Sequence, residues 1–168
     1  MYRLTIYKRK KLFTQKRSKK TMIKRIFSPT LPSAWFTSAL LLLARLFIGI
    51  LFLSHGMQKW LMYATMSQDF PDPLHVGSAL SLILTIIAEI VCSFFFIFGF
   101  MYRLVLLPMI FAMGMAFFVV HDGSLDGGEL SLIYMMTFVF MYFIGPGKFS
   151  MDAWLKHKLE EAVSGKSE

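Results

Sequence analysis

Apolar residues along this chain gather in four long stretches separated by short polar segments. The stretches run over residues 35–63, 74–100, 104–120 and 130–144. A helix rises about 1.5 Å per residue and the hydrocarbon core of a bilayer is about 30 Å thick, so a span needs roughly 20 residues. The first two stretches reach that length alone, and the other two reach it with their flanking residues. The pattern predicts an all-α integral membrane protein, a bundle of four spanning helices.

The segments between the stretches contain residues that end helices. Asp69-Phe70-Pro71-Asp72-Pro73 separates the first two stretches, and Gly145-Pro146-Gly147 follows the fourth. Gly99 marks a tight second connection, and the third connection, residues 122–128, is short, acidic and rich in glycine. Proline and glycine at these places favour turns, so we expect three short loops.

Charge is distributed unevenly and predicts the orientation in the membrane. The whole chain is 56% apolar and 17% charged, against about 25% charged in ordinary soluble domains. Residues 1–34 hold eleven Lys or Arg and no acid, and the remainder has seven bases and ten acids, a net charge of −3. Basic loops stay in the cytoplasm. The basic segments are the N-terminal tail, the loop with Arg103 and the C-terminal tail, so both termini are predicted to be cytoplasmic.

Three parts follow from this pattern. We expect a basic cytoplasmic N-terminal tail at 1–34, a four-span membrane domain at 35–150 and a cytoplasmic C-terminal tail at 151–168. We interpret the basic tail as a topology signal that also contacts lipid headgroups, and not as a nucleic-acid binding segment.

Two ionisable residues fall at membrane depth. An ionised side chain there costs at least about 2.5–3.5 kcal/mol, so each needs a partner or a purpose. Arg45 lies in the first predicted span and Glu89 in the second, and we expect them to pair. Helical spacing places Gly49, Phe52, Gly56 and Lys59 on the face of Arg45, and Ser78, Thr85 and Ser93 on the face of Glu89. The pair is interpreted either as a structural ion pair or as a site for a quinone or a proton.

A second polar group is expected at the outer surface. It comprises His55, Lys59, His121, Asp122 and Glu129. Imidazole and carboxylate groups can carry protons, bind a quinone carbonyl or hold a metal, but the two histidines are also typical of ordinary interfacial positions. We do not expect a metal site, because the thirteen methionines are ordinary fillers of apolar interiors and the one cysteine, Cys92, lies in an apolar run.

Motifs of self-contained catalysis are missing from the sequence. It has no GxGxxG or GxxxxGK[ST] loop, no HExxH and no GxSxG. No cofactor is therefore encoded by a motif. Redox chemistry would use a membrane quinone or a cofactor on another subunit.

Several of these residues, in this order, resemble the DoxX family. The resemblance is carried by Arg45-Leu46, Gly49, Ser54-His55-Gly56, Lys59, Glu89, Gly99, Arg103, His121, Glu129 and the closing GPGKFSMD at 145–152. It covers roughly residues 36–155. The family usually has GPGR followed by an aromatic residue, Ser, Leu and Asp, so Lys148 departs from the common arginine but keeps its charge.

The resemblance implies a small four-helix protein of the bacterial inner membrane. Relatives are associated with thiosulfate:quinone oxidoreductase, with membrane oxidoreductase complexes active in thiol and oxidative stress, and with quinone detoxification. It makes Arg45, Lys59, Glu89, His121 and Glu129 candidate residues, to which His55 is added by position. The leading hypothesis is a subunit of a quinone-linked oxidoreductase system with a soluble redox partner. The alternatives are a non-catalytic scaffold that anchors soluble redox enzymes and, third, a small transporter; a homo-oligomer is compatible with each.

Overall fold

The structure is a computed structural model that describes residues 33–164. The expected basic tail at 1–34 thus falls almost wholly outside the described residues. The predicted orientation of the termini relative to the membrane stays a prediction.

Helices account for most of the described chain, and no strand occurs within it. The elements are α2 (Ala34–Leu61), α3 (Tyr63–Met66), α4 (Ser78–Phe98), α5 (Tyr102–Met115), η1 (Ala116–Val120), α6 (Leu125–Ile144) and α7 (Met151–Ser164). Four helical segments are long and apolar enough to cross a membrane: α2, α4, α5 continued by η1, and α6. The predicted all-α fold with four spans is confirmed.

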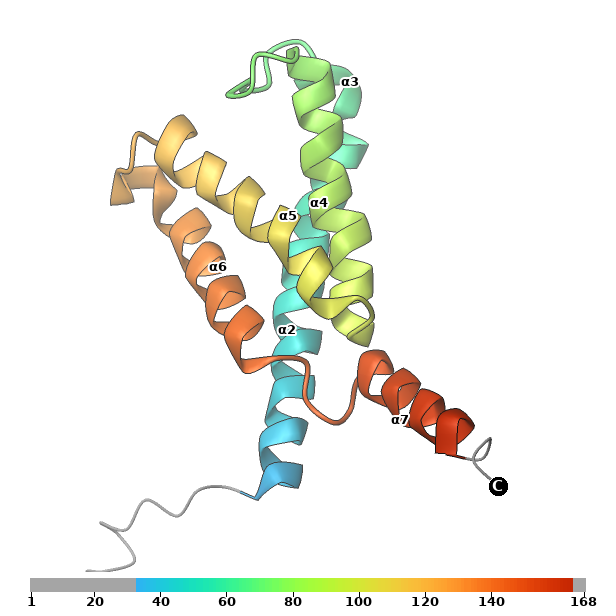
Figure 1. Cartoon of the computed structure of the whole chain (residues 1–168). Coiled ribbons are helices and arrows are strands. Elements are labelled where there is room, and N and C mark those ends of the chain that lie inside the picture. The colour runs from blue at the N-terminus through green and yellow to red at the C-terminus, as the bar shows by residue number, and fades with distance from the viewer. Residues whose placement is uncertain (1–32, 165–168) are drawn as a thin grey trace, which may run out of the picture. The chain divides into compact units, whose positions relative to one another are not determined.

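The four spanning helices pack in chain order around a core of aromatic side chains. α2 and α4 run side by side in opposite directions, α5 packs on α4 and α6 packs on α5 (Figure 1). Phe52 of α2 and Phe96 of α4 both contact Phe138 of α6, with ring centroids 4.9 and 5.8 Å apart. These contacts tie the first span to the last across the middle of the bundle.

Two glycines of α2 allow the close approach of α4. A Cβ on Gly56 would lie 2.8 Å from the Cβ of Glu89 and 3.1 Å from its backbone carbonyl carbon. One on Gly49 would collide with Ile97. Small residues have this role at membrane helix interfaces, so the predicted contact face of α2 is confirmed.

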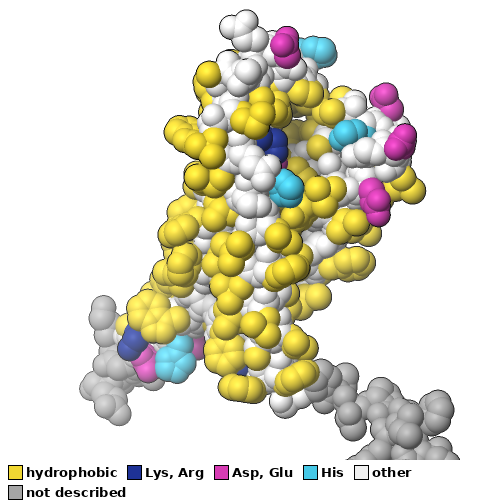
Figure 2. All heavy atoms as spheres, turned by 180° about the vertical axis from the view of Figure 1, so that it is seen from behind, with side chains coloured by type: hydrophobic (Ala, Val, Ile, Leu, Met, Phe, Trp, Pro, Cys, Tyr) yellow, Lys and Arg dark blue, Asp and Glu magenta, His cyan; other side chains and the backbone are white. Residues whose placement is uncertain are grey.

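Large apolar side chains cover the outside of the spans (Figure 2). Leu43, Phe47 and Ile50 of α2 are each more than half exposed. A soluble protein rarely exposes so continuous an apolar surface. In a membrane protein this surface faces lipid.

The third span departs from regular α-helix twice. Pro108 lies inside α5 and lacks the N–H that would bond to the preceding turn. The span then ends in the π-helix η1, where the backbone N–H of His121 donates to the carbonyl of Ala116 over 3.1 Å. Single π turns are frequent at functional sites, and this one directly precedes a candidate residue.

Candidate functional site: a pocket beside a buried ion pair

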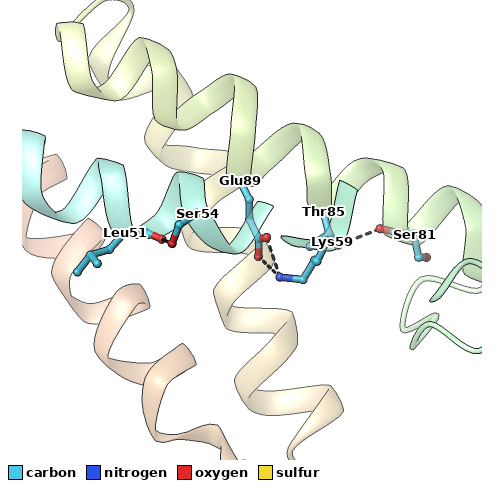
Figure 3. Close-up of polar contacts among 6 residues, drawn as sticks. All are labelled: Leu51, Ser54, Lys59, Ser81, Thr85 and Glu89. Carbon is cyan, nitrogen blue, oxygen red and sulfur yellow. Dashed lines mark hydrogen bonds and ion pairs between the residues drawn. The ribbon is translucent and has the colours of Figure 1, made fainter. Parts of the chain in front are cut away.

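Glu89 is the most deeply buried acid in the described chain, and its partner is Lys59. The Nζ of Lys59 donates to Oε1 and Oε2 of Glu89 at 2.8 and 2.7 Å. The two side chains point toward one another from α2 and α4 (Figure 3). The Glu89 side chain is 2% exposed and that of Lys59 is 24% exposed. The pair is therefore open to its surroundings on the lysine side only.

A pocket of about 490 Å³ lies against this pair. Its walls come from α4, α5, η1 and one residue of α6, and residues 70–74 of the first loop add a further wall. Most of the lining is apolar, and the polar side chains are Lys59, Ser81, Thr85, Glu89, His121 and Ser131. In Figure 2 a basic side chain is set back in a hollow of the apolar surface, with histidine side chains beside it. Apolar walls with a few convergent polar groups are typical of small-molecule sites.

His121 reaches the pocket because of the backbone around it. It is the residue that ends η1, and its N–H donates to the carbonyl of Ala116 across the wider π turn. Gly128 then lets its ring approach α6: a Cβ there would lie 3.0 Å from the Cβ of His121 and 3.1 Å from the Cδ2 of Phe117. The structure thus places His121 and Lys59, two residues of the expected outer group, in the lining of one pocket.

The other three residues of the expected outer group, His55, Asp122 and Glu129, do not line the pocket. His55 lies near enough to Glu89 to interact with its charge, and its ring packs edge-on against Tyr134 with centroids 5.8 Å apart. Glu129 is exposed on the first turns of α6 and does not line the pocket. His55 therefore packs on Tyr134 near the ion pair without bonding to it, and Glu129 lies outside the site.

The first loop is held over the pocket by Asp72. Its carboxylate accepts hydrogen bonds from the Ser81 hydroxyl at 2.6 Å and from the backbone N–H of Val76 and Gly77 at 3.0 and 2.6 Å. These bonds, the one from Ser81 above all, lower the pKa of Asp72 below its ordinary value because they favour the charged form. Phe70, Pro71, Pro73 and Leu74 of the same loop line the pocket. Asp72 thus fastens this wall to the start of α4.

The expected pair between Arg45 and Glu89 does not form. Arg45 and Lys59 are fourteen positions apart on α2, which is about 21 Å along a helix. Because α4 runs antiparallel, Glu89 lies opposite Gly56 and Lys59. Arg45 lies toward the other end of α2 and meets the turn after α4 instead. Arg45 and Glu89 were predicted to meet at one contact between the two helices, whereas the structure places them in two separate sites.

Arg45 belongs to a cluster at the opposite end of the bundle, formed with Gly99, Tyr102, Phe149 and Asp152. The Arg45 side chain is fully buried and its Nη2 donates to the backbone carbonyl of Phe149. Asp152 accepts from the backbone N–H of Met101 and Tyr102, both at 2.9 Å, so it caps the start of α5. The GPGKFSMD segment therefore fastens the C-terminal end of α6 to α2 and to the turn between α4 and α5.

Sequence reasoning missed the residues that build the walls of the pocket. Ser81 and Asp72 are joined across nine positions of chain, and η1 has no signature in a uniformly apolar run. Pro108 was the one visible signal, because proline in an apolar span indicates a local break in helical hydrogen bonding.

No group of three or more His, Cys, Asp or Glu side chains that could hold a metal occurs within residues 33–164. Cys92 is buried and unpaired. The polar groups of the pocket are thus one ammonium, one carboxylate, one imidazole and three hydroxyls. Such a set can donate hydrogen bonds to the oxygens of a neutral ring compound and exchange protons with them.

Comparison with known proteins agrees with this architecture. The DoxX family model matches residues 40–122. Residues 40–122 form a DoxX domain. The matched segment contains Lys59, Glu89 and His121, so these three polar residues of the pocket lie inside the DoxX domain, whereas α6 and the GPGKFSMD segment follow it.

One relative is similar to this chain over a longer stretch than the DoxX model matches. An uncharacterized protein of Haemophilus influenzae is 29% identical over 125 residues, which cover 69% of this chain and 83% of that protein. No solved structure matches the chain. The chain is thus a multi-pass membrane protein with a DoxX domain, as the resemblance implied.

Proposed function

We propose that this protein is the quinone-binding membrane subunit of a quinone-linked oxidoreductase system of the bacterial inner membrane. The observation that carries the proposal is the Lys59–Glu89 ion pair in the wall of an apolar pocket between membrane-spanning helices. Ionisable residues inside the membrane are costly, so a buried carboxylate paired with a lysine between spanning helices supports a functional role.

The pocket has the size and character that a quinone ring requires. Its volume of about 490 Å³ lies within the range of about 300–1,000 Å³ typical of small-molecule sites. Side chains such as Phe111, Met115 and Leu84 offer apolar contacts to a ring and to the first part of an isoprenoid tail. A tail could leave between helices into the lipid, because the surrounding surface is apolar.

The polar groups could serve the two oxygens of the ring. The Lys59 ammonium keeps a third N–H beyond the two that Glu89 accepts, and this N–H can donate to a quinone carbonyl. His121, in the same lining, can bind the other oxygen or deliver a proton to it. Reduction of a quinone to a quinol takes up two electrons and two protons. We assign proton delivery to these side chains and the supply of electrons to a partner.

A partner subunit is part of the proposal because the chain lacks motifs for binding a redox cofactor. The sequence has no dinucleotide-binding loop, and the polar groups of the pocket include no redox centre. A soluble enzyme that oxidises a sulfur or thiol substrate would deliver electrons at the membrane surface. This chain would then bind the quinone and deliver protons to it.

Direct titration of quinone binding tests the proposal. The purified protein in detergent is titrated with a short-tailed ubiquinone and a short-tailed menaquinone, and binding is followed by calorimetry. Glu89→Gln and Lys59→Met should each weaken binding at least about tenfold, the loss expected for an unpaired polar contact of about 1.4 kcal/mol. Ser54→Ala is the matched control, because Ser54 is an exposed serine of α2 that bonds only to the backbone of Leu51 (Figure 3).

Three results decide the matter. Binding by the wild type that is weakened in the two variants and kept in Ser54→Ala supports the pocket. Equal affinity in the wild type and all three variants would mean that the quinone binds at another site. A wild type that binds neither quinone would contradict the proposal and leave the pair with a packing role in a scaffold.

A further inference from the structure

Helix α7 carries an apolar row that none of the spanning helices covers. Met151, Leu155, Leu159 and Val163 follow one another at intervals of four, so they occupy one side of the helix within an arc of about 120°. Leu159 and Val163 are 63% and 74% exposed. Residues 151–168 were predicted only as a C-terminal tail, whereas Met151–Ser164 form an amphipathic helix.

The start of α7 is fixed at the level where the spans end. The backbone N–H of Asp152 donates to the carbonyl of Gly99 at 3.0 Å, and its carboxylate binds the N–H groups at the start of α5. Gly99 and Met101 form the turn between α4 and α5, which is the end of two membrane spans. From this point α7 runs away from the long helices and packs lengthwise on none of them (Figure 1).

The apolar surface of the spans continues onto α7. One groove is lined by Leu42 and Leu46 of α2, Ile97 and Phe98 of α4, and Met151 and Trp154 of α7. A second groove joins Phe100 to Leu155, Leu159 and Val163, and the charged residues Asp152, Lys156 and Glu160 complete its lining. Leu46 and Phe98 also belong to the exposed apolar surface of the spans, so that surface extends to Met151 and Trp154 of α7, with Lys148 and Ser150 also lining the groove.

The charged residues of α7 are arranged as in a helix that lies at the boundary between lipid and water. His157 and Glu161 lie on the side opposite the apolar row and are exposed, and Glu160 is exposed at the edge of the row next to Val163. Lys156 and Lys158 flank the row, with side chains 78% and 60% exposed. Long lysine side chains at the edges of an apolar face extend to the headgroups while their stems stay among apolar groups.

We propose that α7 is an interfacial helix that lies in the surface of the bilayer at the end of the bundle bearing Arg45. Its apolar row enters the acyl region, and its polar side faces water. The occupant of the uncovered face is therefore lipid, because the face continues the lipid-facing surface of the spans. This inference is independent of the proposed quinone site, which lies at the other end of α2 and α4.

Spin labels on the two sides of α7 test this placement. The chain has a single cysteine, Cys92, which is 9% exposed, so an added exposed cysteine is the main site of labelling. Leu159→Cys places a nitroxide on the apolar row, and His157→Cys places one on the polar side as the matched control. Both positions are exposed, so neither change disturbs the core. The full chain is reconstituted in vesicles of phosphatidylcholine and phosphatidylglycerol, and collisions with oxygen and with a water-soluble nickel chelate are measured.

The proposal requires opposite results at the two positions. The label at 159 should collide more with oxygen, which concentrates in acyl chains, and the label at 157 more with nickel. Nickel preference at both positions would overturn the proposal, because α7 would then lie in water and its row would be free for a protein partner. Oxygen preference at both would also overturn it, because the helix would then be fully inserted.

Discussion

Lys59 and Glu89 form an ion pair in which the carboxylate is sealed inside the helix pair and the ammonium faces a pocket. Both carboxylate oxygens accept from the same Nζ, at 2.7 and 2.8 Å. Glu89 emerges opposite Gly56, and the close approach of the two backbones excludes other partners from its inner side. Because only the lysine side is open, loss of the lysine leaves a buried charge with little access to solvent.

Removal of Lys59 should therefore destabilise the protein more than removal of both charges. Lys59→Met leaves Glu89 buried without its partner, and breaking a buried pair costs about 3–5 kcal/mol. We expect the lower end of this range, since the Lys59 side chain is 24% exposed. The double variant Lys59→Met with Glu89→Leu should recover most of the loss. Thermal unfolding in detergent measures all three proteins.

An exposed lysine gives the control for this comparison. Lys156 pairs with Glu160 at 3.8 Å on the surface of α7, and such pairs contribute about 0–1 kcal/mol. Lys156→Met should leave the melting temperature nearly unchanged. A Lys59→Met protein as stable as Lys156→Met would contradict the buried pair.

The sequence predicted the faces of α2 and α4 better than it predicted the partners on them. Periodicity placed Arg45, Gly49, Gly56 and Lys59 on one side of a helix, and these positions do face the bundle. Which cation meets Glu89 depends on how far the antiparallel helices slide along each other. That register is set by packing of Gly49 and Gly56 against α4, which a pattern of apolar positions does not contain.

The remaining parts of the site depend on contacts between distant segments. Asp72 was visible in the sequence as a loop acid, but only the fold shows that it binds Ser81 and that the loop lines a pocket. The closing GPGKFSMD segment was the most specific sequence feature, and its role at Arg45 required the three-dimensional position of Phe149. Helix α7 was missed because its charged residues suggested a polar tail.

A methyl group at Gly56 should separate α2 from α4. The Cβ of Gly56→Ala would lie 2.7 Å from the Cγ1 of Ile90 and 2.8 Å from the Cβ of Glu89. Overpacking of this kind costs about 1–3 kcal/mol. The substitution also pushes on the backbone of Glu89, so we expect weaker quinone binding together with lower stability, measured by unfolding and titration of the same sample.

Gly114→Ala controls for the change in helix propensity. Gly114 lies in α5, and a Cβ there would meet only the Sδ of Met135, at 3.5 Å. This is ordinary contact, so the alanine should stabilise the helix by up to about 1 kcal/mol. If Gly56→Ala were stabilising to the same extent, the close approach of the two helices would be wrong.

The first loop should loosen from the pocket in acid. The pKa of Asp72 is lowered in the folded protein, so its bonds stabilise the loop fully above the ordinary aspartate pKa of 3.8. That contribution is lost as the pH falls through the lowered folded-state pKa. We expect a loop resistant to proteolysis at neutral pH and down to about pH 4, with increased hydrogen exchange at residues 70–77 only below this range.

Asp72→Asn tests whether the Asp72 carboxylate causes this acid response. The amide keeps one acceptor oxygen but loses the charge, so the loop should exchange faster at neutral pH and show no further change on acidification. Asp69→Asn is the matched control, because Asp69 lies in the same loop and does not line the pocket. An acid response that persists unchanged in Asp72→Asn would assign it to another group.

The turn between α4 and α5 should tolerate no side chain at Gly99. Gly99 has φ +66°, and a Cβ there would collide with the guanidinium of Arg45 and lie 2.7 Å from the Cβ of Ser150. Gly123 has nearly the same φ, +68°, but a Cβ there would meet nothing within 4 Å. Gly123→Ala should therefore show the backbone strain alone, about 1–2 kcal/mol. Gly99→Ala should add a steric cost of about 1–3 kcal/mol, because Arg45 is fully buried and has no space to withdraw. Unfolding in detergent compares the two variants, and equal melting temperatures would mean that Arg45 does not occupy the turn.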